Sequence, residues 1–142
     1  MSETINIERS GTKRVLLVDD HDLFREVLGV VLEHHAGFGG SVHAGSLAEA
    51  RRALDDRKEG RGSWFGLAIV DLDLPGGGGL ELLEKLRQAA PDVPVMGVTA
   101  NPKQGPRDRA LGVGASEVIV LSTSGEEIVA AARRLGGSGV SR

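Results

Sequence analysis

The sequence contains no cysteine, and aromatic residues are scarce, with one Trp, three Phe and no Tyr among 142 residues. The lack of cysteine excludes a disulfide scaffold, a thiol nucleophile and a thiolate-bound metal, and it is compatible with a cytoplasmic location. Because aromatic residues are so few, Trp64 and Phe65 are interpreted as packing or loop anchors rather than as a binding stack. No apolar run approaches the length that crosses a bilayer, so we expect no contact with a membrane.

An excess of basic charge is also missing, since the formal net charge is -3 at pH 7. Such a chain has no general attraction to nucleic acid. The pairs Arg51-Arg52 and Arg133-Arg134 fall within helical patterns, where solvated helix faces explain them. We therefore expect no nucleic-acid binding by this segment itself.

Apolar runs alternate with helical patterns five times along the chain. The runs predicted to be strands are residues 15–18, 41–44, 67–70, 93–99 and 118–121. Five strand-helix units in one small domain imply a parallel sheet with helices on both faces, because right-handed crossovers carry each helix over the sheet. The sequence therefore predicts a single-domain, flavodoxin-like, doubly wound α/β fold with strand order 2-1-3-4-5.

This pattern occupies residues 13–135, which we expect to form the folded domain. Residues 1–12 mix charged and polar residues without an apolar core, and are expected to be a disordered lead-in rather than a signal peptide. The glycine-rich residues 136–142 are expected to be a flexible tail or the start of a linker.

Two of the predicted strands end at acidic residues. Asp19 and Asp20 follow the first strand, and Asp71 follows the apolar part of the third. The switch point of this strand order lies between these two strands, so the three carboxylates should converge on one point. Carboxylates held so close repel one another, and Mg²⁺, which prefers oxygen ligands, waters and phosphoryl groups, relieves that repulsion. The sequence therefore predicts a metal-assisted phosphoryl site.

Several motifs occur in a specific order and spacing. They are Val15-Leu16-Leu17-Val18-Asp19-Asp20-His21, Asp71-Leu72-Asp73-Leu74-Pro75, Gly79-Leu80-Glu81, Val98-Thr99-Ala100 and Gly114-Ala115. Together they resemble the receiver domain of response regulators in two-component signalling, over about residues 13–135. The stretch from Asp19 to Arg25 is also similar to receivers that precede LuxR-type helix-turn-helix output domains. DNA contact would then come through an output domain outside this chain.

The resemblance implies a role for each acidic residue. Asp71 would be the phosphoacceptor, Asp19 and Asp20 would bind Mg²⁺ together with it, and the backbone carbonyl of Asp73 would complete the metal shell. Thr99 would contact the phosphoryl oxygens. An aspartate carboxylate can form an acyl phosphate when a metal neutralises the charge on the transferring oxygens, so these roles are chemically consistent. The implied partner is a histidine kinase or phosphotransfer protein, and the resemblance also allows the chain to form a homodimer. The chain would be a signalling module and no enzyme.

Two positions depart from the receiver pattern. Receivers usually carry a lysine at the end of the fifth strand and an aromatic residue shortly before it, whereas ungapped alignment places Leu121 and Val118 there. A charge-assisted hydrogen bond is worth about 1.5 to 3 kcal/mol, so its loss weakens phosphoryl binding without abolishing a site held by Mg²⁺. Lys103 or Arg107 could replace the charge, although we expect both to face solvent. The sequence therefore predicts a receiver with an atypical switch.

Two other interpretations stay open at this stage. A pseudo-receiver would act as a protein-interaction module without accepting phosphate, and Leu121 with Val118 favours it. A phosphohydrolase similar to the haloacid dehalogenase superfamily would use Asp71-Leu72-Asp73 as nucleophile and acid/base. Pro75 and the upstream position of the other acids speak against this enzyme. Steady turnover of a phosphate ester would favour the enzyme, and one stable phosphoryl group per chain would favour the receiver.

Overall fold

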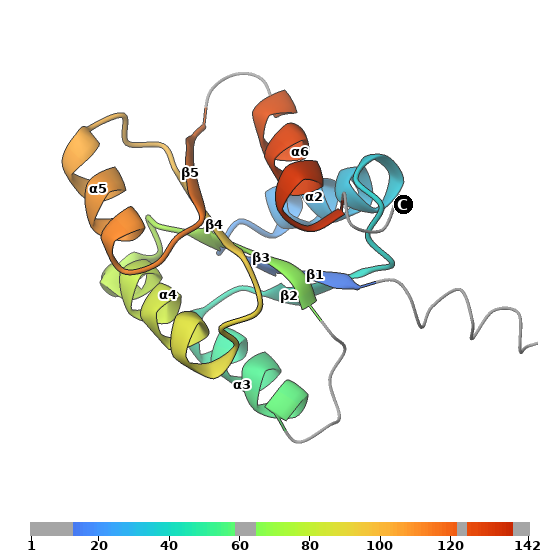
Figure 1. Ribbon diagram of the computed structural model, residues 1–142, viewed down its shortest axis with the longest axis horizontal. Helices are drawn as coiled ribbons and strands as arrows, with labels where there is room; N and C mark the ends of the chain where they lie inside the picture. The colour runs from blue at the N-terminus through green and yellow to red at the C-terminus, as the bar shows by residue number, and fades with distance from the viewer. Residues whose placement is uncertain (1–12, 59–64, 122–124, 138–142) are drawn as a thin grey trace, which may run out of the picture.

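A five-stranded parallel sheet forms the centre of the molecule (Figure 1). The computed structural model describes residues 13–58, 65–121 and 125–137. The strands are β1 (Arg14–Val18), β2 (Ser41–Ala44), β3 (Phe65–Asp71), β4 (Val95–Thr99) and β5 (Glu117–Val120), in the order β2-β1-β3-β4-β5. This order confirms the predicted flavodoxin-like, doubly wound α/β fold.

Within the described residues, five α-helices connect and cover the strands. They are α2 (Asp22–His35), α3 (Leu47–Lys58), α4 (Gly78–Ala89), α5 (Gln104–Gly112) and α6 (Glu126–Ala132), joined by the 3-10 turn η1 (Pro75–Gly77) and the π-helical turn η2 (Arg133–Gly137). Among the described residues, none of these helices has the length and apolar character needed to cross a membrane.

The helices lie on both faces of the sheet. Figure 1 shows α2 and α6 on one face and α3, α4 and α5 on the other. Successive residues of a strand point to opposite faces of the sheet, so each face has its own hydrophobic core. Leu16 and Val18 pack with α3, α4 and α5, whereas Val15 and Leu17 pack with α2 and α6. Because the central strands are buried on both faces, they are continuous apolar runs rather than alternating ones.

The parallel register brings the acidic strand ends side by side. Val18, the last residue of β1, pairs with Val70 of β3, so Asp19 and Asp71 follow neighbouring backbone positions. On the other side of β3, Asp71 pairs with Val98, which directly precedes Thr99. Asp19, Asp71 and Thr99 therefore lie at the same edge of the sheet, as the switch-point argument predicts.

Most strand bounds differ from the predicted ranges by one or two residues: β1 and β5 begin one residue early and β4 begins two residues late, at Val95. The third strand begins at Phe65 rather than at residue 67, because Phe65 pairs with Arg14 and its ring is buried in the core beside α3 and α4. The glycine run after Pro75 predicts a turn followed by a helix from about Leu80, whereas α4 begins at Gly78 within that run. A Cβ on Gly79 would lie 2.8 Å from the carbonyl oxygen of Asp71, so the absence of a side chain lets α4 pack directly against the end of β3.

Helical structure at the C-terminal side extends two residues past the predicted domain end at 135. Gly136 lies against β3, where a Cβ would come within 2.6 Å of the carbonyl oxygen of Gly66. This close packing explains why residues 136 and 137 continue the helical turn. The predicted lead-in, residues 1–12, and the rest of the predicted tail, residues 138–142, lie outside the described residues.

Candidate metal and phosphoryl site

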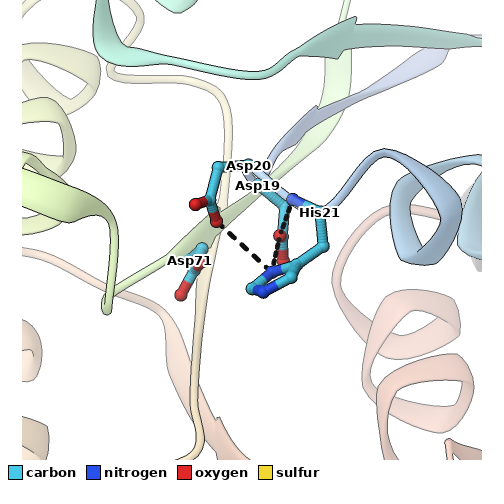
Figure 2. Close-up of side chains that lie close together, drawn as sticks. All are labelled: Asp19, Asp20, His21 and Asp71. Carbon is cyan, nitrogen blue, oxygen red and sulfur yellow. Dashed lines mark hydrogen bonds and ion pairs between the residues drawn. The ribbon is translucent and has the colours of Figure 1, made fainter.

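The three predicted acidic residues form one cluster at the edge of the sheet. Potential ligand atoms of Asp19, Asp20, His21 and Asp71 all lie within 4.8 Å of one another (Figure 2). Asp19 and Asp71 are each only 6% exposed, whereas Asp20 and His21 reach solvent. The cluster is therefore a buried pair of carboxylates with one carboxylate and one imidazole at its open side.

Burial and like charge make ionisation of Asp71 unfavourable. Loss of solvent around its carboxyl group raises the pKa of Asp71 to about 6, and the negative charges of Asp19, Asp73 and Asp20 act in the same direction. The backbone N–H of Asp73 donates to Asp71 Oδ1 at 2.8 Å and offsets part of this effect. A divalent cation fits such a site because it neutralises the excess negative charge and accepts oxygen ligands.

His21 contacts carboxylate oxygens of both Asp19 and Asp20. Its backbone N–H and its ring Nδ1 lie 2.8 and 2.9 Å from Asp19 Oδ1, and Nδ1 is 3.3 Å from Asp20 Oδ1. The hydrogen bond to Asp19, followed by the charges of Asp19 and Asp20, raises the pKa of His21. The ring of His21 would therefore compete with a metal ion for the oxygens of Asp19 and Asp20. The sequence alone does not assign a role to this histidine.

Arg25 fixes the backbone that carries Asp19. Its guanidinium group donates to the carbonyl oxygen of Asp19 and to Asp22 Oδ1, and its Nε donates to His43 Nδ1 at 3.2 Å. These bonds connect the first turn of α2 to the ends of β1 and β2. The sequence predicts no role for Arg25, because the contact of this side chain with β2 depends on how α2 packs against the sheet.

Thr99 lies at the end of β4 and contacts the acidic loop after β3. Its side chain is buried, and Oγ1 donates to Asp73 Oδ1 at 2.9 Å. The next backbone N–H, that of Ala100, donates to Asp73 Oδ2 at 2.9 Å. The carboxylate of Asp73 thus accepts both donors, a contact that the sequence analysis missed, since it assigned only the backbone carbonyl of Asp73.

The end of β5 is apolar, as the ungapped alignment predicts. Leu121 is half-buried against the core beside α2 and α6, and its N–H donates to the carbonyl oxygen of Thr99 at 2.7 Å. Val118 is buried in the opposite core. Lys103 and Arg107, the two candidate replacements for a lysine, are exposed. The strand neighbouring Thr99 therefore presents an aliphatic side chain at the position where receivers usually carry an ammonium group.

A doubly wound parallel sheet with buried carboxylates at its switch point defines an α/β protein whose ligand site lies at the carboxyl ends of the strands. Residues 15–133 match the response regulator receiver domain family, and the chain belongs to this family. It is a receiver domain of two-component signal transduction, as its motifs predict. Receiver domains are typically signalling modules that interact with histidine kinases or phosphotransfer proteins.

Known proteins resemble this chain in both sequence and structure. The phosphate regulon transcriptional regulatory protein PhoB of Klebsiella pneumoniae is 34% identical over 120 residues, which cover 83% of this chain and 49% of PhoB. The chain thus spans about half the length of this curated relative.

Solved structures give the same assignment. Response regulator protein TrrA from Thermotoga maritima, solved in complex with Mg²⁺-BeF, is 27% identical and superposes with a TM-score of 0.72 over 87% of this chain and 99% of TrrA. A two-component response regulator of the LuxR family from Aurantimonas sp. SI85-9A1 is 26% identical, with a TM-score of 0.71 over 92% of this chain and 93% of that protein. The LuxR-family likeness agrees with the motif after β1.

Proposed function

We propose that Asp71 is the phosphoacceptor of this receiver and that Mg²⁺ binds to Asp19, Asp20, Asp71 and the backbone carbonyl of Asp73. The observation that carries the proposal is the convergence of three carboxylates, two of them buried, at the end of β1 and β3. The Mg²⁺-BeF complex of TrrA supports the same chemistry for a related fold.

Each residue has a defined part in the transfer. A carboxylate oxygen of Asp71 attacks the phosphorus of a phosphohistidine, the phosphorus–nitrogen bond breaks, and the imidazole leaves with its electron pair and takes up a proton. The backbone N–H of Asp73 orients the Asp71 carboxylate through its bond to Oδ1. When bound, the metal neutralises charge that collects on the transferring oxygens. The Thr99 hydroxyl donates to a phosphoryl oxygen.

The phosphodonor docks, in this proposal, on the exposed apolar face of α2. Leu23, Val27 and Val30 are 74%, 53% and 56% exposed and share one helix face through their spacing. This helix starts directly after the acidic cluster, so a protein seated on it holds its phosphohistidine near Asp71. The proposed partner is a histidine kinase or phosphotransfer protein in the cytoplasm. We also propose that the receiver can form a homodimer, and that any contact with DNA is made by an output domain outside this chain.

The decisive experiment is phosphate uptake from a small phosphodonor with Mg²⁺, followed by mass spectrometry of the whole chain and of its peptides. We expect one phosphoryl group per chain, located on Asp71, and none in Asp71→Asn, because an amide is a poor nucleophile of nearly equal size. Asp55→Asn, an exposed residue of α3, is the matched control and should retain uptake. A phosphoryl group on Asp73 would reverse the assignment, and no uptake would make the chain a pseudo-receiver.

A further inference from the structure

The Asp73 carboxylate accepts hydrogen bonds from two donors at the proposed phosphoryl site. One oxygen accepts from the Thr99 hydroxyl and the other accepts from the Ala100 backbone N–H, both at 2.9 Å. The backbone N–H of the same residue donates to Asp71 Oδ1. Asp73 therefore connects the proposed phosphoacceptor with the end of β4 through its backbone on one side and its side chain on the other.

The two donors form an anion-binding pair. They come from consecutive residues, and both converge on a single carboxylate, which presents two negatively charged oxygens much as a phosphoryl group does. The Thr99 hydroxyl has one proton to donate, and so does the Ala100 N–H. A phosphoryl group on Asp71 can use this pair only after the carboxylate has released it, because each proton is already engaged and the two anions repel.

We infer that the Asp73 side chain is an internal competitor of the phosphoryl group, holding Thr99 and Ala100 in the unphosphorylated protein and lowering the affinity of the site for phosphoryl oxygens. The inference rests on the proposed function of Asp71, and it assigns to Asp73 the role of limiting how tightly a phosphoryl group on Asp71 is held. Leu121 sharpens the effect, since no ammonium group at that position is available to bind the displaced carboxylate.

The measurement is the affinity for beryllium fluoride, a phosphoryl mimic, by calorimetry at saturating Mg²⁺. Asp73→Ala should bind the mimic about tenfold more tightly than the parent chain, because two hydrogen bonds are released to it. Asp73→Asn, which keeps one acceptor for Thr99 but turns an amide toward Ala100, should fall between the two. Asp108→Ala, which removes an exposed acidic side chain from α5, is the control for a simple change of net charge and should match the parent.

A double-mutant cycle separates competition for donors from charge repulsion. In a Thr99→Val background the hydroxyl is absent, so the gain from Asp73→Ala should shrink to the part that Ala100 supplies. A gain of equal size in both backgrounds would overturn the inference and leave repulsion as the cause. No gain in Asp73→Ala or Asp73→Asn, with the parent still binding the mimic, would also overturn it.

A second readout needs no phosphoryl mimic. In the metal-free parent the Ala100 amide is hydrogen-bonded, so its hydrogen exchange by NMR should be slow and should accelerate in Asp73→Ala, with neighbouring strand amides unchanged. Unchanged exchange at Ala100 would contradict the contact itself. Failure of the parent and every variant to bind beryllium fluoride would instead overturn the phosphoryl site, and the competitor role with it.

Discussion

The two ends of the phosphoryl site differ in kind. The β1 and β3 side holds three carboxylates and an imidazole, and burial raises the pKa of Asp71 there to about 6. The β4 and β5 side holds one hydroxyl, that of Thr99, next to aliphatic Leu121. The first side has the groups needed to receive a phosphoryl group, and the second has few groups that would sense its arrival. Under the proposed function, we therefore expect the uptake of a phosphoryl group and the conformational response to it to depend on different sides of the site.

The largest effect is expected on the acidic side. Asp20→Ala should weaken Mg²⁺ binding in the absence of phosphate by about tenfold, because the ion loses one of three charged ligands. Calorimetric titration measures this, with Asp55→Ala on the exposed face of α3 as the control. If Asp20→Ala binds the ion as well as the parent does, the acidic side is not the metal site.

One substitution on the β4 and β5 side should strengthen the binding of a phosphoryl mimic. Leu121→Lys should tighten beryllium fluoride binding several-fold, since a charge-assisted hydrogen bond contributes about 1.5 to 3 kcal/mol and the ordering of the lysine side chain offsets up to about 1.5 to 2 kcal/mol of it. Leu121 is only half-buried, so the lysine stem can keep the apolar contacts while the ammonium group reaches the site. Leu121→Met is the control for altered packing. Equal affinities of the lysine and methionine variants would show that position 121 does not face the phosphoryl group.

A smaller effect concerns pH and the metal-free protein. Because the folded-state pKa of Asp71 is raised to about 6, the folded chain binds more protons than the unfolded chain above pH 4. The free energy of unfolding should therefore fall as pH rises from about 4 to about 6 at this residue, and Asp71→Asn should remove that dependence. We expect Asp71→Asn to stabilise the metal-free chain at pH 7 by about 1 kcal/mol, after allowance for screening by water at the open side. Urea unfolding at pH 4 and pH 7 checks this.

The smallest effect is expected across residues 104–121. A phosphoryl group moves a conformational equilibrium only through contacts that differ between two states, and this side offers few of them. Hydrogen exchange of this segment should change little when beryllium fluoride binds, provided that calorimetry confirms binding. Broad changes in protection across 104–121 would erase the distinction between the two sides and assign a transmitting role to Lys103, Arg107 or another group.

The convergence of Asp19 and Asp71 could be predicted from the sequence, because the residues next to each acid specify the strand that carries it. The apolar runs before Asp19 and Asp71 specify neighbouring strands, and strand order alone then places both carboxylates at one edge. The helix start at Gly78 was not predictable in the same way, because four consecutive glycines have the pattern of a turn. What selects a helix there is the close approach of Gly79 to Asp71, which is a tertiary contact.

The side-chain contacts of Asp73 and His21 were beyond the sequence pattern for a related reason. Asp73 lies in the turn that follows β3, where the N–H of Leu74 donates to the carbonyl oxygen of Asp71 at 3.4 Å, and its side chain reaches Thr99 from that turn. A short side chain in such a loop has no periodicity that predicts its direction. His21 is the N-cap residue of α2, but its side chain makes no capping hydrogen bond and lies against Asp19 instead.

The strand that carries Asp71 determines how the site can move. All seven residues of β3 are buried, and the strand is paired on both sides, with β1 and with β4. Opening such a strand requires global unfolding, whereas the loop after it can rearrange on its own. A phosphoryl group on Asp71 would therefore be attached to a fixed strand, and we expect the side chains around that carboxylate to set the lifetime of the acyl phosphate.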